Sequence, residues 1–344
     1  MSENHSTTMH AVAYRKNLPI DDPQSLLDVE LPVPSPGPRD LLVQVEAVAV
    51  NPVDYKVRQN ADPGEKLRVL GWDAAGTVVA VGEQVELFKV GDEVYYAGAL
   101  DRPGANSQFH TVDERLVGRK PTTLSFAEAA ALPLTSLTAW EGLFDRMGLR
   151  NGALERTGAL LVTAAAGGVG SIVTQLARAL TGLTVIGTAS RPETAAFARR
   201  MGAQHIIDHR KPLAAQLAEV APGGADYIFS TAGTDRNIAA YAEALNPFSQ
   251  IVAIDDFDTL DIGALKPKSA SFHWEFMYTR SMFQTPDQAM QHHILTQVAH
   301  LVGIGVLTTT ATQDLGPVNA DNLREAHRIQ ESGTAIGKTT LTGL

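Results

Sequence analysis

The chain of 344 residues contains no cysteine. This absence excludes disulfide bonds, thiol nucleophiles and every metal site that depends on cysteine ligands. Long apolar runs are also missing, because stretches such as residues 159–166 fall far short of the roughly 20 residues that span a bilayer. The start of the chain lacks the basic and apolar regions of a secretory signal. We therefore expect residues 1–9 to form a flexible tail, and the protein to be cytoplasmic with no membrane partner.

Positive charge is scarce and scattered along the chain. There are 28 Lys and Arg residues against 38 Asp and Glu residues, which gives a net charge of −10 with histidine neutral. We expect no nucleic-acid partner, because phosphate binding needs a concentrated positive face. At roughly 150 residues per domain, the length predicts about two domains of a globular protein.

The first third of the chain has short apolar stretches that are separated by turn residues. Strands are predicted at residues 41–50 and 75–81, and this spacing indicates an irregular, β-rich unit. The pattern changes near Ser125. Residues 126–144 have helical spacing, and Ser125 with Glu128 predicts a capping box at the start of that helix.

Strands and helices alternate in the second part of the chain. Strands are predicted at residues 159–163, 183–188, 205–207, 227–230 and 250–254, and helices at 171–180 and 193–201. This alternation predicts an α/β fold with a doubly wound parallel sheet, the Rossmann arrangement. The tail is expected to add helices at 288–305 and 322–332 and a last strand at 338–341.

A glycine turn lies between the first strand of this alternation and its helix. Small residues there let the backbone approach a pyrophosphate, whose charge the helix N-terminus favours. Glycines also serve tight packing, but the flanking strand, helix and second strand favour a dinucleotide site. Ala165 replaces the first glycine of the commonest fingerprint. The expected cofactor contacts in this turn are Ala164, Gly167, Gly168, Val169 and Gly170.

The end of the second strand predicts NADP rather than NAD. An NAD site usually places an acid there to bind the ribose 2′-hydroxyl. The strand instead ends in Ser190 and Arg191, and a guanidinium can pair with a 2′-phosphate. His209 is a second candidate for that phosphate, or a solvated loop histidine. Glu193 is interpreted as a first-turn helix residue that suits the helix dipole.

Five motifs, taken in order, resemble the medium-chain dehydrogenase/reductase superfamily. They are AVAVNPVDYKVRQ, LGWDAAGTVVAVGEQVELFKVGDEVY, AALPLTSLTAWEGLF, VTAAAGGVGSIVTQLAR and AIGKTTL. Within it, the chain looks most like the zinc-free quinone oxidoreductase branch and is similar to bacterial proteins labelled zinc-type alcohol dehydrogenase-like. The resemblance covers residues 11–344. It implies a β-rich, GroES-like catalytic domain made of residues 1–136 and 282–344, with an NADP-binding Rossmann domain at 137–281 between them.

The resemblance also implies that no metal is bound. Zinc enzymes of this superfamily hold the metal with a Cys, a His followed by Glu, and a second Cys. Those positions correspond here to Asn51, Trp72, Asp73 and Leu134. One carboxylate cannot make a tetrahedral zinc site. Val53 stands where the alcohol enzymes place the hydroxyl of a proton relay.

Hydride transfer without a metal suits acceptors that are already electron-poor. Quinones and enones accept a hydride directly and then need only a proton and some charge stabilisation. We therefore expect an NADPH-dependent reductase of an electrophilic small molecule, either a quinone or an activated alkene. Two alternatives stay open: a zinc-free alcohol dehydrogenase or carbonyl reductase, and a non-catalytic NADPH-binding protein with a structural or sensing role.

The catalytic candidates follow the strand at 41–50. Lys56 falls where relatives have a Tyr or His near the nicotinamide ribose, so its ammonium can bind the ribose or stabilise an oxyanion, or simply be exposed on a turn. Tyr55 is a candidate proton donor, with a packing role equally open. Asp54 is expected to orient Lys56 or to cap the following turn. Asn51 and Trp72 are the expected substrate contacts.

The resemblance assigns two more cofactor residues and a dimer. Thr138 matches a threonine that contacts the nicotinamide in relatives, and Lys338 matches a basic residue near the cofactor phosphates. The aromatic residues from Phe272 to Tyr278 alternate with strand period, which favours a core or subunit interface, with a contact to the substrate cleft as the minor alternative. Because relatives pair through the edge of the nucleotide-binding sheet, a C2 homodimer is expected.

Overall fold

The computed structural model describes residues 7–64, 66–149, 152 and 157–343. These residues form two compact units. Unit 1 combines the chain up to Leu134 with the chain from Tyr278 onward, and unit 2 is Thr135–Met277. Strand β1 begins at Thr8, so the expected tail at 1–9 is too long, and residues 1–6 of it lie outside the described residues. In the part of the chain that is described, no helix is both long and apolar enough to cross a membrane.

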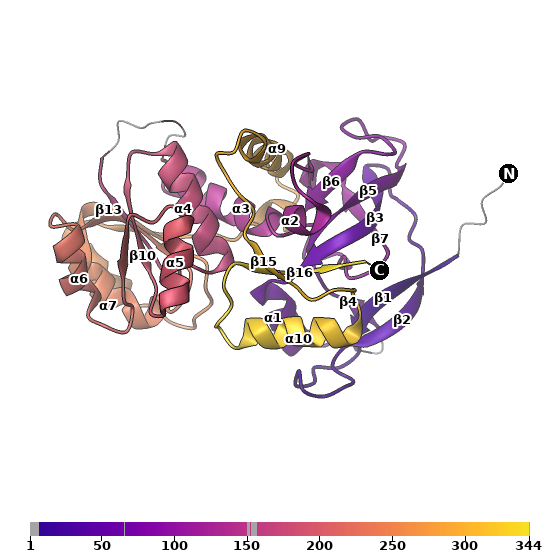
Figure 1. The fold of residues 1–344 in the computed structure, drawn as a ribbon, viewed down its shortest axis with the longest axis horizontal. Coiled ribbons are helices and arrows are strands. Elements are labelled where there is room, and N and C mark those ends of the chain that lie inside the picture. Colours follow the sequence, from indigo (N-terminus) through magenta and orange to yellow (C-terminus); the bar gives the residue numbers. More distant parts are fainter. Residues whose placement is uncertain (1–6, 65, 150–151, 153–156, 344) are drawn as a thin grey trace. The chain divides into compact units, whose positions relative to one another are not determined.

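Unit 2 is built on a six-stranded sheet in which every recorded strand pair is parallel (Figure 1). Its strands are β9 (Ala159–Val162), β10 (Thr184–Thr188), β11 (His205–Ile207), β12 (Ala225–Ser230), β13 (Leu245–Ala253) and β14 (Ser271–Trp274). Their order is β11-β10-β9-β12-β13-β14, with β9 inside and the chain winding outward to both edges. This is the doubly wound sheet that the strand and helix alternation predicts.

Helices connect the parallel strands of unit 2. They are α4 (Gly168–Leu180), α5 (Pro192–Arg200), α6 (Leu213–Val220), α7 (Thr234–Ala244) and the 3-10 helix η3 (Ile262–Lys268). Parallel neighbours need such crossovers, because a tight turn cannot return the chain to the same end of the sheet. Leu160, Leu161 and Val162 in β9 are fully buried, as expected for a strand covered on both faces.

Unit 1 contains two sheets whose strand pairs are antiparallel except for the parallel pair β15–β16. One has the order β15-β16-β3-β5-β6-β8 with β7 also paired to β3, and the other is β2-β1-β4. The strands are β1 (Thr8–Tyr14), β2 (Leu27–Pro32), β3 (Asp40–Ala49), β4 (Arg68–Val69), β5 (Asp73–Val81), β6 (Glu93–Tyr96), β7 (Phe109–Asp113), β8 (Val117–Arg119), β15 (Ala311–Asp314) and β16 (Lys338–Thr342). Because β16 pairs with β3, the C-terminal segment completes a sheet begun by the N-terminal one.

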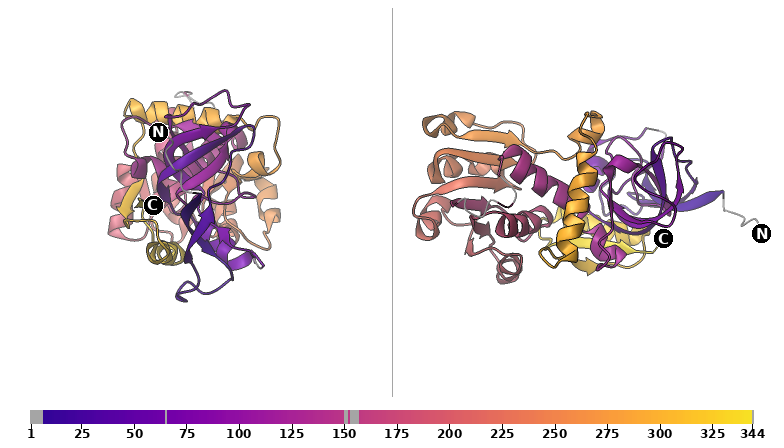
Figure 2. Two further views of the ribbon diagram at one scale, coloured as in Figure 1. Left: turned by 90° about the vertical axis from the view of Figure 1, so that its right-hand side faces the viewer. Right: turned by 90° about the horizontal axis from the view of Figure 1, so that it is seen from above.

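The helices of unit 1 come from both ends of the chain, as the two views in Figure 2 show. They are α1 (Pro52–Asn60), η1 (Glu114–Leu116), α2 (Phe126–Ala130), α8 (Thr279–Met282), α9 (Met290–Gly303) and α10 (Ala320–Glu331). Arg58 of α1 is buried and is held by Glu331 and by Nδ1 of His327 on α10. The N-terminal and C-terminal segments of unit 1 are therefore joined by side chains as well as by strand pairing.

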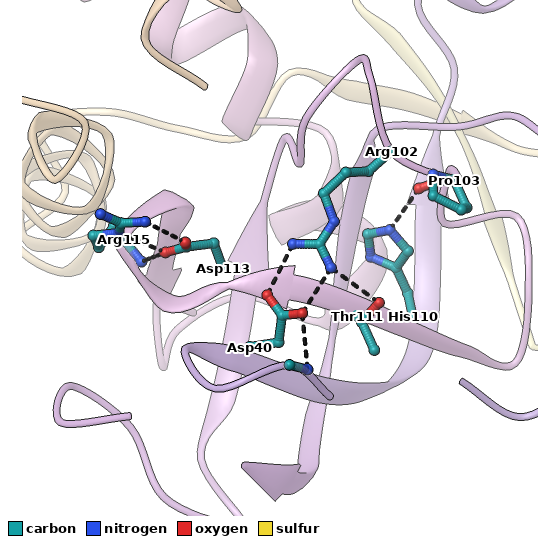
Figure 3. A network of polar contacts seen from close by, with 8 residues as sticks. Asp40, Arg102, Pro103, His110, Thr111, Asp113 and Arg115 are labelled. Atoms are coloured by element: carbon teal, nitrogen blue, oxygen red, sulfur yellow. Dashed lines mark hydrogen bonds and ion pairs between the residues drawn. The ribbon is translucent and has the colours of Figure 1, made fainter. Parts of the chain in front are cut away.

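A second polar network stabilises unit 1 at β3 and β7 (Figure 3). Arg102 donates to both carboxylate oxygens of Asp40, at 2.8 Å each, and to Oγ1 of Thr111 at 3.2 Å. The ring of His110 stacks on Tyr96, and its Nε2 lies 2.9 Å from the carbonyl oxygen of Pro103. Burial lowers the pKa of His110 to about 4. These groups bind one another, so we interpret this network as structural.

The helix expected at 126–144 is interrupted. Its capping box is confirmed, since Ser125 N–H donates to Oε2 of Glu128 at 2.9 Å and Glu128 N–H donates to Oγ of Ser125. However, α2 ends at Ala130, α3 (Pro133–Trp140) begins anew, and a π-helical turn, η2 (Glu141–Arg146), follows. The cause is Pro133, which lacks the N–H of a helix interior and suits a first helical position.

The alternating aromatic run also ends earlier than predicted. Phe272 and Trp274 lie on β14, but the strand stops there. Tyr278 precedes α8 and is 2% exposed in unit 1, with its ring edge-on to Trp72. The end of the strand cannot be predicted from periodicity alone, because Tyr278 keeps the spacing of a strand although it belongs to unit 1.

Candidate functional site

The turn after β9 is tight and leads directly into helix α4. Ala164 adopts a positive φ of 44°, and its N–H donates to Oγ1 of Thr188 at 2.9 Å. Gly167 N–H donates back to Ala164 O at 2.8 Å, and α4 begins at the next residue. The first amides of a helix have no acceptor within that helix. Those of Gly168, Val169 and Gly170 therefore suit the anionic pyrophosphate that the sequence predicts.

Two glycines permit the close packing of this turn. A Cβ at position 170 would lie 2.4 Å from Ala164 O and 2.9 Å from Ala165 Cα, so only glycine fits without movement. A Cβ at Gly187 would lie 2.7 Å from the Cβ of Ala165. The alanine that replaces the first glycine of the common fingerprint is thus accommodated by a glycine on the neighbouring strand β10. This compensation was not predicted from the sequence.

Two guanidinium groups lie at the end of β10. Arg191 precedes α5, and its Nε lies 3.1 Å from Glu193 Oε1, on the first turn of that helix as expected. Arg210, which the sequence analysis missed, donates from Nη2 to Ser190 O at 2.6 Å and also pairs with Asp208. His209 is exposed beside it. The position of Arg210 in the sequence could have identified it, because Arg210 follows the third strand of the sheet just as Arg191 follows the second.

Unit 1 contains a buried polar cluster at the ends of three paired strands. Strand β3 pairs with both β5 and β16, which brings together Asn51, Asp73 and Lys338. These three side chains are 2%, 0% and 3% exposed. Lys338 Nζ donates to Asp73 Oδ2 at 2.9 Å, to Val50 O at 2.9 Å and to Asn51 Oδ1.

The remaining polar atoms of Asp73 and Asn51 are also bound. Asp73 Oδ1 accepts a hydrogen bond from Leu134 N–H at 2.7 Å. Asn51 Nδ2 donates to Asp73 Oδ2 at 2.8 Å and faces Ala49 O at 3.4 Å. The buried carboxylate is thus surrounded by an ammonium, an amide and a backbone N–H, which compensates for its removal from water.

Asp54 caps α1 beside this cluster. Its Oδ2 accepts a hydrogen bond from Asn51 N–H at 2.6 Å, so Asp54 caps the start of its own helix rather than a turn that follows it. Asp54 is 1% exposed. Burial raises the pKa of Asp54 to about 7; the charge of Asp73 adds to the rise, whereas the hydrogen bond from Asn51 and the charge of Lys338 oppose it.

The two expected catalytic side chains lie on α1. Tyr55 and Lys56 are both half-buried, and they stand on a nine-residue helix rather than on a turn. As neighbours on a helix, they point about 100° apart. Thr138, the expected nicotinamide contact, is buried on α3 in unit 2. Roles for these three residues stay predictions.

Three expected ligand contacts have partners within the protein. Trp72 is 0% exposed and donates from Nε1 to Ala99 O at 3.0 Å. Asn51 uses its amide on Asp73, and Lys338 uses its three donors on the cluster rather than on cofactor phosphates. We predicted substrate binding by Asn51 and Trp72 and phosphate binding by Lys338, and these roles stay predictions. The burial of the three side chains and their internal hydrogen bonds disfavour such roles.

The residues at the zinc-ligand positions do not fit a zinc ion. Of the four, only Asp73 can offer a charged ligand, and its two oxygens are already engaged by Leu134 N–H and by Lys338 with Asn51. A zinc site needs four donors in a tetrahedron, commonly sulfur, imidazole or carboxylate. Across the described ranges, no group of three or more His, Cys, Asp or Glu residues is placed to hold a metal.

Known proteins match both parts of the chain. Residues 168–285 match the family described as zinc-binding dehydrogenase, and residues 37–140 match the alcohol dehydrogenase GroES-like domain. A zinc-type alcohol dehydrogenase-like protein of Staphylococcus epidermidis is 38% identical over 97% of this chain and 99% of its own. A crystal structure from Rhizobium etli CFN 42, provisionally described as a zinc-dependent alcohol dehydrogenase protein, is 52% identical over 99% of both chains, with a TM-score of 0.94.

Two further relatives carry more specific descriptions. The 2-methylene-furan-3-one reductase of Solanum lycopersicum is 38% identical over 60% of this chain and 53% of its own. The structure of mycobacterial Rv1454c complexed with NADPH is 26% identical over 97% of this chain and 99% of its own, with a TM-score of 0.82. With the GroES-like sheet of unit 1 and the doubly wound sheet of unit 2, these matches show that the chain belongs to the medium-chain dehydrogenase/reductase superfamily.

Proposed function

We propose that the protein is an oxidoreductase that transfers a hydride from NADPH to an enone or a quinone without a metal ion. The observation that carries the proposal is the buried cluster at Asp73, where the Lys338 ammonium stands among the zinc-ligand positions. Without a Lewis acid, a simple carbonyl depends on protein donors alone to become a hydride acceptor, whereas an enone or a quinone is already electron-poor. The name of the tomato relative, a methylene-furanone reductase, supports an enone as the acceptor.

Residues of unit 2 would hold the cofactor, which supplies the hydride when bound. The amides at the start of α4 would bind its pyrophosphate, and Thr138 its nicotinamide. Arg191 and Arg210 at the end of β10 would bind the 2′-phosphate that distinguishes NADPH from NADH. Ser190 and His209 lie beside them as secondary candidates. The NADPH complex of the mycobacterial relative supports the choice of cofactor.

Lys56 and Tyr55 are the groups that we propose for the remaining chemistry. When the β-carbon of an enone accepts the hydride, negative charge develops on the carbonyl oxygen. The Lys56 ammonium would stabilise that oxygen, and the Tyr55 hydroxyl would give the α-carbon its proton and regain one from water. The product is the saturated ketone, and two electrons pass from the cofactor to the alkene.

A substrate panel tests this proposal. NADPH oxidation is measured with an enone, the corresponding saturated ketone, a quinone and an aldehyde. We expect turnover with the enone or the quinone and none with the saturated ketone. Turnover with the aldehyde or the saturated ketone instead would favour a carbonyl reductase, and tight NADPH binding with no oxidation across the panel would favour a structural or sensing role.

We also propose that the protein is a C2 homodimer that pairs through β14. This strand is the last in the order of the sheet, and among the described residues it pairs with β13 alone. Trp274 is 52% exposed and stacks on Phe257, with ring centroids 4.7 Å apart, and Phe276 is 47% exposed. An exposed strand edge with apolar side chains favours pairing with a second copy.

A further inference from the structure

We propose that the side-chain ammonium of Lys338 occupies an oxygen-lined cation site in unit 1. By occupying it, the ammonium excludes free metal ions from this site. The inference concerns what this site binds and does not depend on the reaction proposed above. It rests on the positions of the acceptors around Nζ, on their burial and on their charge.

Three oxygen atoms converge on Lys338 Nζ, two from the adjacent residues Val50 and Asn51 and one from Asp73. They are Oδ2 of Asp73 on β5, Oδ1 of Asn51 before α1, and the backbone oxygen of Val50 after β3. An ammonium has three N–H groups and no acceptor. The donors and acceptors therefore match one to one, and nothing in this set leaves an N–H for another ligand.

Among the hydrogen-bond partners of Asp73, Lys338 is the one that carries a positive charge. Asp73 is fully buried, and its other partners are an amide and a backbone N–H, which carry no net charge. A buried carboxylate without a positive partner is strongly unfavourable. Carboxylate, amide and carbonyl oxygens are also the ligands that hard cations prefer. The surroundings are thus those of a cation site, and Lys338 is its occupant.

Lys120 provides a matched comparison. It is also buried, and its ammonium donates to the backbone oxygens of Pro121 and Leu124. Its carboxylate partner, Glu93, lies 3.2 Å away but is 51% exposed. Water can solvate Glu93 when Lys120 is removed, whereas Asp73 has no such compensation. Only the site of Lys338 should therefore recruit another cation when the lysine side chain is shortened.

Chemical rescue tests the inference. Lys338→Ala removes the atoms that propylammonium would restore, and Lys120→Ala is the control. We expect Lys338→Ala to lower the midpoint of thermal unfolding by about 10 °C, since breaking a buried pair typically costs several kcal/mol. Propylammonium chloride should raise the midpoint of Lys338→Ala above that in sodium chloride of equal ionic strength. The wild type and Lys120→Ala should respond equally to the two salts. An equal response of Lys338→Ala would overturn the proposal.

A second experiment covers the case in which Lys338→Ala does not fold. Lys338→Met, Asp73→Asn and the double variant remove the positive charge, the negative charge and both. We expect the double variant to lose less stability than the sum of the two single variants, and additive losses would contradict the pairing. The wild type, dialysed against Zn²⁺, should bind none at this site. Stoichiometric binding that Asp73→Asn abolishes would show that the site is open to metal.

Discussion

Lys338 Nζ lies 2.9 Å from Asp73 Oδ2, and both side chains are buried within unit 1. The contact joins the first residue of β16 to the first residue of β5, which are 265 positions apart in the sequence. It also fixes the start of α1, because the same ammonium binds Val50 O and Asn51 Oδ1. The C-terminal segment therefore contributes directly to the position of the helix that carries Tyr55 and Lys56.

Cofactor preference should depend on the two arginines at the end of β10. We expect NADPH to bind more tightly than NADH, and Arg191→Ala and Arg210→Ala each to weaken NADPH binding roughly tenfold while leaving NADH binding unchanged. The measurement is a fluorescence titration with each cofactor. Arg199→Ala, an exposed arginine on α5, is the control. Equal affinity of the wild type for both cofactors would refute the assignment.

The glycine turn should tolerate an added methyl group at one position and not at another. Gly170→Ala places a Cβ 2.4 Å from Ala164 O, whereas the nearest atom to a Cβ at Gly167 is 3.3 Å away. We expect Gly170→Ala to lower the free energy of unfolding by about 1–3 kcal/mol, as other overpacked sites do, and Gly167→Ala to lower it less. Chemical denaturation of both variants measures this. Similar losses for the two variants would show that the turn is not packed as described.

The buried carboxyl of Asp54 should make stability depend on pH. Its pKa is raised from 3.8 to about 7 in the folded state, so between these values the folded protein holds a proton that the unfolded chain has lost. The contribution of Asp54 is therefore complete below about pH 4 and is lost as pH rises through about 7. Asp54→Asn keeps an oxygen acceptor for Asn51 N–H but cannot titrate.

The comparison of the two proteins isolates this residue. Between about pH 5 and 6, the free energy of unfolding of the wild type should fall relative to that of Asp54→Asn by up to about 1.4 kcal/mol per pH unit. Glu83→Gln, at an exposed position in the same unit, should keep the slope of the wild type. Parallel profiles for the wild type and Asp54→Asn would contradict the raised pKa.

Turnover should require the two half-buried side chains of α1. We expect Lys56→Ala and Tyr55→Phe each to lower kcat for an enone by roughly 10²-fold or more, the usual size of a lost proton-transfer or charge-stabilising group. NADPH affinity should persist in Tyr55→Phe. Gln59→Ala, an exposed residue on the same helix, should keep normal turnover. Steady-state kinetics measure kcat for the three variants. Wild-type kcat values in all three would exclude the proposed roles of Lys56 and Tyr55.

The oligomeric state should depend on the edge of the unit 2 sheet. Sedimentation equilibrium should give twice the chain mass of 36.7 kDa at micromolar concentration. Trp274→Glu, which places a charge on β14, should shift the protein toward the monomer. Val90→Glu changes an exposed residue of unit 1 and should leave the dimer intact. A wild type that sediments only as a monomer would rule out the interface.

The doubly wound sheet of unit 2 could be predicted because its signals are local. The buried strand at Ala159–Val162, the glycine turn and α4 follow one another without a gap, and the alternation repeats along the chain. Chain chirality then leaves few ways to arrange such units. The break at Pro133 was also visible in the sequence, but the helical spacing on both sides of it outweighed one residue.

The buried cluster could not be predicted, because it depends on contacts between distant segments. Lys338 begins a strand that pairs with β3, and its sequence does not show which groups this pairing brings to the ammonium. Its assignment to cofactor phosphates came from the family resemblance. For the same reason, the close approach of Ala165 to Gly187 and the contact of Arg210 with Ser190 could not be predicted. Motifs identify residue types and spacing along the chain, whereas these contacts are set by tertiary packing.

Transfer of deuterium from NADPH that carries deuterium at both C4 positions of the nicotinamide tests the central claim most directly. The protein is first treated with a chelator, dialysed and shown by elemental analysis to contain no stoichiometric zinc, and it is then given an enone. The account predicts deuterium at the β-carbon of the saturated product and a rate equal to that of the untreated protein. Loss of the rate after chelation with recovery on adding zinc, or a product without deuterium at the β-carbon, would contradict it.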